Sequence, residues 1–323
     1  MTLYRNTRTA VSALVILLIL FEVTSDCSHA QQPRSSAHSR LIDSIPSTLF
    51  KKMFQNHQLV GSPGLTWKKQ RVVTVAFDGG SDELYQLIEM TANEWTALGG
   101  QLSFSFKDET GQYRHWTSND KSAAANIRIG FANTGYWSLL GVLAKNVDPG
   151  DPTMNFGGFT TDLRKYFNGQ NQDQWRTSYE HTTILHEFGH AIGLSHEHFN
   201  QECQKDLKID TILAYLTGPP NNWSTEQARF NIDAQYYSMV LAQQSGPLES
   251  KLLSSPTTDQ ASVMLYVFPI SYYKTGGASV CKPIGDHGED WPTKLSNGDK
   301  QFYLASYRTI PSPFGAASPK KGK

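Results

Sequence analysis

The order of apolar and polar residues predicts regular elements in the first half of this 323-residue chain. Residues 71–77 are mostly β-branched and apolar, as in a strand, and residues 78–80 then turn the chain. Residues 81–98 predict a helix, because a serine stands at the cap and apolar residues recur every three or four positions. Residues 102–106 and 126–131 predict two more strands. We therefore expect an α/β start, with the first helix on one face of a twisted sheet.

Further helices are predicted in the second half of the chain. Residues 177–180 read Thr-Ser-Tyr-Glu, the pattern of a capping box, and open a helix that carries a buried apolar side. Short helices are expected at 210–216 and 225–230. A last helix is expected at 300–307, capped by Ser296-Asn297-Gly298-Asp299.

Composition indicates an ordinary globular protein without an electrostatic partner. The chain is 39% hydrophobic and 18% charged, and 29 basic residues balance 29 acidic residues. A formal net charge of zero gives no basis for binding nucleic acid or an anionic membrane. We therefore expect neither as a partner.

The N-terminus has the pattern of a signal peptide. Arg5 and Arg8 precede an apolar run from Ala10 to Phe21, and Ser28-His29-Ala30 is a small-x-small cleavage site. About twelve mostly apolar residues are too few to span a bilayer, although an uncleaved anchor is the alternative. We expect residues 1–30 to be removed and the mature protein to be secreted.

Three further segments are predicted after the signal peptide. Residues 31–66 are polar, with one amphipathic patch, and form either a propeptide or a flexible extension; Asp43 is their one candidate for a latency residue. Residues 67–309 form the folded domain, and residues 310–323 have the composition of a disordered tail.

Two cysteines remain once Cys27 is removed with the signal peptide. Cys203 and Cys281 are an even number in an oxidising compartment, which favours one disulfide over two unpaired buried thiols. Asn222-Trp223-Ser224 is an N-glycosylation sequon, which matters only if the host is eukaryotic.

The stretch 186–196 carries the candidate chemistry, because it reads H-E-x-x-H-x-x-G-x-x-H. Helical spacing places His186 and His190 one turn apart on one face, where both imidazoles can reach one metal ion. Glu187 lies about 100° around the helix, in reach of a water on that metal. Gly193 would let the chain turn in a left-handed conformation and bring back His196 as a third ligand.

Three histidines and an open position are the arrangement of a catalytic zinc site. The alternative is a buried amphipathic helix that happens to carry histidines. Five fixed positions over eleven residues make a chance match rare, so we predict zinc as the cofactor.

This stretch resembles the zinc-binding motif of the metzincin metallopeptidases. Glu197, next after His196, makes it similar to the astacin branch and to secreted astacin-like enzymes of microbes. Ser262-Val263-Met264-Leu265-Tyr266 resembles the Met-turn of that family, although Leu265 departs from the histidine usual in astacins. The resemblance implies that Met264 packs under the three imidazoles and that Tyr266 touches the zinc or the substrate.

The resemblance also implies a fold. It is α+β and zincin/metzincin-like, with a twisted mixed sheet, a long zinc-binding helix and an irregular, mostly helical C-terminal lobe. Residues 136–141 would supply an edge strand, with a plain hairpin as the alternative. His181 is expected to be solvated, and His198 to lie outside the ligand set.

The implied function is that of a secreted zinc endopeptidase. Glu187 would act as the general base, and Tyr266 would donate a hydrogen bond to the developing oxyanion. The partner would be a polypeptide substrate bound extended in the cleft of a monomer. Two alternatives stay open: a non-catalytic zinc-containing binding protein, and a narrow-specificity processing protease or toxin.

Overall fold

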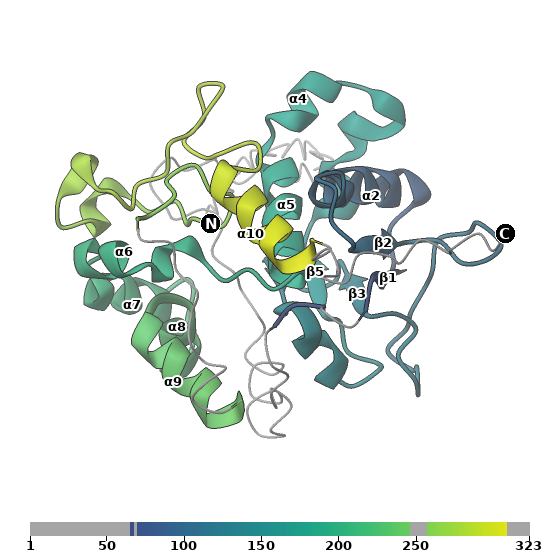
Figure 1. Ribbon diagram of the computed structural model, residues 1–323, viewed down its shortest axis with the longest axis horizontal. Coiled ribbons are helices and arrows are strands. Elements are labelled where there is room, and N and C mark those ends of the chain that lie inside the picture. The colour runs from purple at the N-terminus through teal and green to yellow at the C-terminus, as the bar shows by residue number, and fades with distance from the viewer. Residues whose placement is uncertain (1–64, 68–69, 246–256, 309–323) are drawn as a thin grey trace, which may run out of the picture. The chain divides into compact units, whose positions relative to one another are not determined.

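A five-stranded mixed sheet occupies the first half of the folded chain (Figure 1). The computed structural model describes residues 65–67, 70–245 and 257–308. The strands are β1 (Val72–Asp78), β2 (Ser103–Ser105), β3 (Ile127–Gly130), β4 (Tyr136–Ser138) and β5 (Met154–Phe156), in the order β2-β1-β3-β5-β4. Four strands are parallel, and β4 pairs antiparallel with β5. The expected edge strand is therefore β4.

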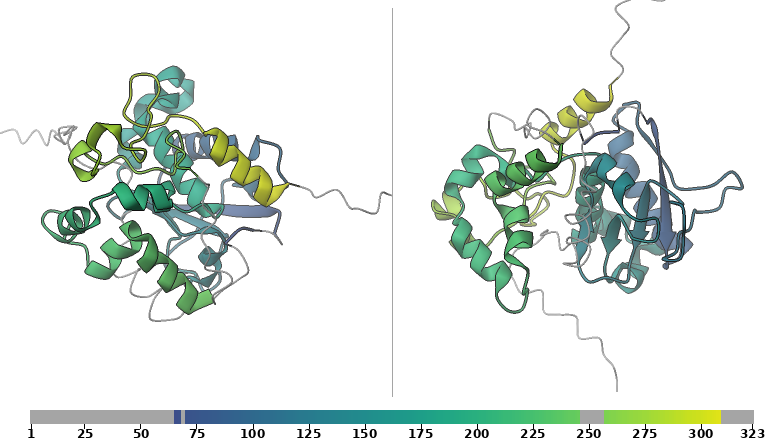
Figure 2. Two further views of the ribbon diagram at one scale, coloured as in Figure 1. Left: turned by 60° about the vertical axis from the view of Figure 1, so that its left-hand side comes forward. Right: turned by 90° about the horizontal axis from the view of Figure 1, so that it is seen from below.

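Helices make up most of the remaining regular structure. They are α2 (Asp82–Thr96), α3 (Phe159–Asp162), α4 (Gln172–Arg176), α5 (Tyr179–Ala191), α6 (Gln201–Asp206), α7 (Ile209–Thr217), α8 (Thr225–Ile232), α9 (Ala234–Ser245) and α10 (Asn297–Tyr307). Short 3-10 turns are η1 (Gly141–Asn146), η2 (Arg164–Gly169), η3 (Glu197–Phe199), η4 (Ile270–Tyr272) and η5 (Gly276–Ala278). The two views of Figure 2 agree that α6 to α9 gather on the side of α5 away from the sheet.

The sheet and the helices α2 and α5 share one apolar core. The indole Nε1 of Trp95 in α2 donates to the carbonyl oxygen of Leu185 in α5 at 3.0 Å. The ring of Phe188 in α5 meets that of Phe104 in β2 edge-on, with centroids 5.0 Å apart. Burying aromatic rings of this size contributes about 1.5–3 kcal/mol each. This packing fixes α5, which carries two candidate ligands, against the sheet.

His181 corrects one expectation. Its ring is buried rather than solvated, and its Nε2 lies 2.8 Å from a carboxylate oxygen of Glu94 in α2. The pair links α2 and α5 across 87 residues of sequence. The position of His181 in the sequence does not predict Glu94 as its partner.

The start of α5 also differs from the prediction. Ser178, and not Thr177, is the cap, because its hydroxyl accepts the amide of His181 and the helix begins at Tyr179. The third helical residue is then His181, which cannot return the bond to the cap as a glutamate would. At the other end of the fold, Ser296 and Asp299 do form the expected capping box, although α10 begins at Asn297, three residues early.

Several predicted segments lie outside the described residues. They are the signal peptide at 1–30, nearly all of the extension at 31–66 including Asp43, and the tail at 310–323. The carbonyl oxygen of Leu65, a residue of the predicted extension, accepts the amide of Val142 at 3.0 Å. All described residues belong to the unit His38–Lys323. Across the described ranges, none of the helices has both the length and the apolar character needed to cross a membrane.

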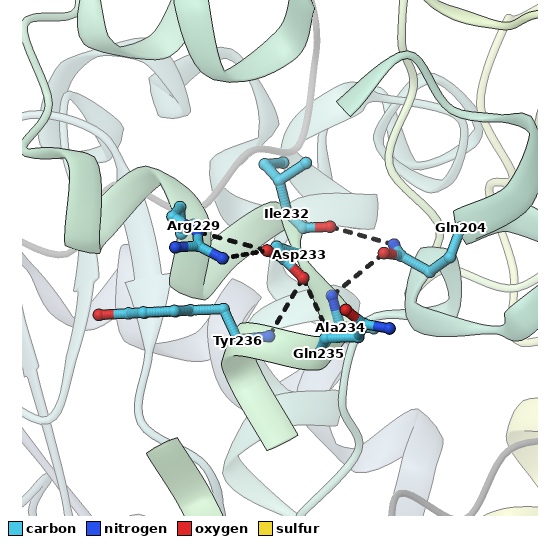
Figure 3. A network of polar contacts seen from close by, with 7 residues as sticks. All are labelled: Gln204, Arg229, Ile232, Asp233, Ala234, Gln235 and Tyr236. Carbon is cyan, nitrogen blue, oxygen red and sulfur yellow. Dashed lines mark hydrogen bonds and ion pairs between the residues drawn. The ribbon is translucent and has the colours of Figure 1, made fainter. Parts of the chain in front are cut away.

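A disulfide and a glutamine hold the helical part of the chain together. Cys203 in α6 is bonded to Cys281, as expected. The side chain of Gln204 donates to the carbonyl oxygen of Ile232 at 3.0 Å and accepts the amide of Ala234 at 3.1 Å (Figure 3). It also donates to the carbonyl oxygen of His198 at 2.9 Å. Gln204 thus bridges the break between α8 and α9 and ties it to the chain that follows the histidine motif.

Candidate metal centre

Three histidines converge where α5 ends. His186 and His190 lie one turn apart on α5, and the chain then turns at Gly193, whose φ is +100°. The amide of Gly193 donates to the carbonyl oxygen of His190 at 2.8 Å, which closes the turn. A left-handed glycine is needed here because a side chain resists this conformation. The turn places His196 against the other two rings, as the sequence predicted.

Hydrogen bonds at Nδ1 set the orientation of the His186 and His190 rings. The Nδ1 atom of His186 lies 2.7 Å from the carbonyl oxygen of Val263, and that of His190 lies 2.7 Å from the carbonyl oxygen of Leu194. A carbonyl oxygen only accepts, so each Nδ1 carries the proton and each Nε2 keeps a lone pair.

The Nε2 atoms face one another. That of His190 lies 3.1 Å from Nε2 of His186 and 3.0 Å from Nε2 of His196. Lone pairs this close repel unless a cation lies between them. Ligand nitrogens about 2.0–2.1 Å from a tetrahedral zinc ion would be about 3.3 Å apart, so the donor set fits such an ion. In the described part of the chain this is the one such group of three, with all ligand atoms within 4.8 Å of one another.

Glu187 follows His186 in α5, and its side chain is buried. Carboxylates are almost never fully buried in folded proteins unless the surroundings stabilise them. A buried glutamate beside a candidate metal-ligating histidine is therefore a candidate for chemistry at that metal.

Met264 packs against α5 at Gly189. A Cβ atom built on Gly189 would lie 2.4 Å from Sδ of Met264, so the missing side chain of Gly189 makes room for the thioether. Met264 is buried and belongs to the main apolar core. The Met-turn and α5 therefore meet at Gly189, and the packing of Met264 under the three imidazoles stays a prediction.

Tyr266 lies among imidazole rings. Its ring stacks on that of His198 with centroids 4.5 Å apart, and its centroid is 4.2 Å from that of His196 and 6.0 Å from that of His186. The side chain is fully buried. His198, which is outside the ligand group as expected, has its Nε2 2.9 Å from the carbonyl oxygen of Asn231.

Three carboxylates hold the segment 258–264, an arrangement that sequence reasoning missed. Each accepts a backbone amide: Thr258 donates to Glu202 at 3.1 Å, Asp259 to Glu197 at 2.8 Å and Val263 to Asp299 at 3.1 Å. The amide of Glu197 in turn donates to the carbonyl oxygen of Met264 at 3.0 Å. The Met-turn is thereby tied to the residue next to His196.

Asp299 is the most enclosed of these carboxylates. Burial raises its pKa above the ordinary value, against hydrogen bonds from Ser262, Ser296 and Val263 that lower it. The Ser262 hydroxyl donates at 2.6 Å and the Ser296 amide at 2.9 Å. One side chain thus joins the cap of α10 to the Met-turn.

Comparison with known proteins places the fold. No protein-family model and no curated protein matches the chain. The structure of myroilysin aligns with a TM-score of 0.51 and 24% sequence identity, over 77% of this chain and 96% of that chain.

The chain shares the fold of myroilysin. The expected α+β class, with a mixed sheet beside the histidine helix, is thereby confirmed. High choriolytic enzyme 1, a hatching enzyme zinc-protease from the medaka fish Oryzias latipes, aligns with a TM-score of 0.34 and 15% identity, over 72% of this chain and 87% of that chain. The likeness to myroilysin concerns the fold, and the chemistry has to be argued from the site.

Proposed function

We propose that this protein is a secreted zinc endopeptidase. The observation that carries the proposal is the set of three buried imidazoles beside a buried glutamate, in which Nε2 of His190 lies 3.0–3.1 Å from Nε2 of the other two histidines. His186, His190 and His196 would hold the zinc. The myroilysin-like fold agrees with this proposal.

Zinc, when bound, would polarise the scissile carbonyl and lower the pKa of a water molecule toward ~7. Glu187 would accept a proton from that water as its oxygen bonds to the carbonyl carbon. The same carboxyl would then give the proton to the amine as the carbon–nitrogen bond breaks. Tyr266 would donate its hydroxyl proton in a hydrogen bond to the oxyanion, a contact made mainly in the transition state.

A polypeptide bound extended is the proposed substrate. The edge strand β4 has a neighbour on one side only within the described sheet, so its other side can accept another strand through backbone hydrogen bonds. The Cys203–Cys281 disulfide supports secretion, because such bonds persist in oxidising compartments, and the N-terminal sequence has the pattern of a signal peptide.

Glu187→Gln tests the proposal most directly. The variant should keep one zinc and the fold, because the ligands are intact, yet lose about 10²- to 10⁴-fold in peptide hydrolysis, because proton transfer is removed. Zinc analysis beside a peptide assay measures both. Activity within about tenfold of wild type would remove Glu187 from the mechanism.

A mixed peptide library separates the alternatives. Incubation with the wild-type protein, with and without a chelator, should give zinc-dependent cleavage at many sites for a broad endopeptidase. Cleavage of one or very few sequences would favour a narrow processing protease or toxin. Zinc binding without any cleavage would favour a binding protein.

A further inference from the structure

A chain of hydrogen bonds runs from α10 to the first candidate ligand. The carboxylate of Asp299 accepts the amide of Val263 at 3.1 Å, and the carbonyl oxygen of Val263 accepts the Nδ1 proton of His186 at 2.7 Å. Val263 therefore joins an aspartate to an imidazole through its two backbone polar groups. The links span 36 and 77 residues of sequence.

Asp299 holds the Met-turn at more than one point. Its Oδ2 accepts the amide of Val263, and its Oδ1 accepts the hydroxyl proton of Ser262 at 2.6 Å. That hydroxyl in turn accepts the amide of Met264 at 3.0 Å. Asp299, Ser262 and Val263 are all buried, so water does not compete for these bonds. One carboxylate thus fixes three successive residues of the turn.

The position of the Val263 carbonyl oxygen matters for the metal. An imidazole is rigid, so a fixed acceptor at Nδ1 sets the direction in which Nε2 points. His190 obtains its acceptor locally, from Leu194 four residues on. His186 instead depends on an acceptor delivered by a distant segment, and Asp299 is the side chain that holds that acceptor.

We propose that Asp299 is a positioning residue for the metal centre, which orients His186 through Val263. The inference rests on the proposed function only in that it requires these histidines to bind zinc. It assigns to Asp299 a second role besides capping the N-terminus of α10.

The competing explanation is that Asp299 serves α10 alone. In the capping box the hydroxyl of Ser296 accepts the amide of Asp299 at 2.9 Å, and Asp299 accepts the amide of Ser296. Ser296 contacts neither Val263 nor Ser262 in any of these bonds. Ser296→Ala also removes the hydrogen bond from the Ser296 hydroxyl to Asp259 at 2.6 Å, but it leaves the bonds of Asp299 to Val263 and Ser262 in place. It is therefore a matched control that weakens the same helix end without removing a link between Asp299 and His186.

The zinc dissociation constant of the full-length mature chain decides between the two explanations, measured by competition with a chromophoric chelator. Asp299→Asn should weaken zinc binding about 10- to 100-fold, the usual effect of losing an outer hydrogen-bond partner of a ligand. Ser296→Ala should stay within threefold of wild type, although both variants should unfold at lower temperature. Equal zinc affinity in Asp299→Asn and wild type, or an equal loss in both variants, overturns the proposal.

A second readout follows His186 itself. In the cobalt-substituted protein, the exchangeable imidazole protons of the ligands give shifted proton resonances. Asp299→Asn should move one of them, that of His186, and Ser296→Ala should move none. If Asp299→Asn does not fold, Ser262→Ala replaces it in both measurements, and a zinc affinity within threefold of wild type would then contradict the proposal.

Failure of the two proposals can be told apart. A wild-type protein that binds no zinc refutes the proposed function. A wild-type protein that binds zinc as tightly as Asp299→Asn refutes the positioning role alone.

Discussion

Tyr266 is held in place by rings, so its hydroxyl can be removed without disturbing its packing. Phenylalanine keeps the stacking on His198 and the contact with His196. If the hydroxyl serves the oxyanion, Tyr266→Phe should lower kcat on the order of 10²-fold and change KM far less, because the ground-state carbonyl gains little from that bond. Steady-state kinetics and zinc analysis check this. A kcat within about threefold of wild type would leave Tyr266 a structural aromatic.

At the scale of residues, the sequence predicts side chains whose positions follow from their spacing on a helix. It does not predict contacts between residues that lie far apart in the sequence. The three histidines follow from helical periodicity and one glycine turn. The pairing of His181 with Glu94 and the bond from Val263 to Asp299 do not, because their partners lie 87 and 36 residues away and no local pattern encodes them. A candidate ligand set is thus readable from the sequence, whereas the groups that orient it are not.

The contact between α5 and the Met-turn gives a prediction at the scale of elements. Gly189→Ala would ordinarily stabilise a helix by up to about 1 kcal/mol. Here the new Cβ atom would lie 2.4 Å from Sδ of Met264, and such overpacking costs about 1–3 kcal/mol. The variant should therefore unfold at lower denaturant concentration than wild type.

A double-mutant cycle identifies the cause. Met264→Ala lowers stability on its own, but Gly189→Ala added to it should cost less than in wild type, with a coupling of about 0.5–3 kcal/mol. Urea unfolding of the zinc-free proteins gives all four values. Additive effects would show that the two residues do not clash.

A helix or strand can be predicted from the sequence only where its own residues carry a capping motif or a periodic apolar pattern. The α10 helix was recognised from the Ser296–Asp299 cap, which forms as a box. The α9 helix was missed, because its sequence AQYYSMVLAQQS has no repeating apolar side. Its start is instead set by Asp233, which accepts the amides of Gln235 and Tyr236, and by Gln204 from another helix (Figure 3). Such a helix depends on tertiary contacts that periodicity does not contain.

At the scale of the molecule, the disulfide closes a loop that contains the Met-turn. Cys203 and Cys281 are 78 residues apart. Replacing both with serine should lower the free energy of unfolding by about 2–5 kcal/mol, chiefly because the unfolded chain gains freedom. Denaturant unfolding measures this, with the oxidised wild type as the reference. Two thiols that react with an alkylating agent in the native protein would contradict the bond.

Acid should weaken the same region through Asp206. Burial alone would raise the pKa of Asp206, but hydrogen bonds from Ser279 and Thr275 outweigh it and hold the pKa below its ordinary value. A lowered pKa contributes stability above the unfolded pKa of 3.8, and this is lost as pH falls through the folded pKa. Asp206→Asn should therefore cost about 1.5–3 kcal/mol at pH 7 and clearly less at about pH 3.

Urea unfolding at the two pH values checks the sign. Asp299 serves as the internal contrast, because burial raises its pKa and its ionised form is disfavoured in the folded state. The contribution of Asp299 to the free energy of unfolding is fullest below its unfolded pKa and falls as pH rises. The same loss in Asp206→Asn at both pH values would refute the assignment.

The hydrogen bond between Val263 and Asp299 can form only late in the synthesis of the chain. The ribosome adds Asp299 113 residues after His186 (299 − 186), so the histidine helix leaves the tunnel long before the carboxylate that orients it through Val263. Bringing such distant segments together carries a loop-closure cost that an incomplete chain has no means to offset. If Asp299 orients His186 as proposed, a nascent or C-terminally truncated chain would lack an oriented metal centre until α10 is made.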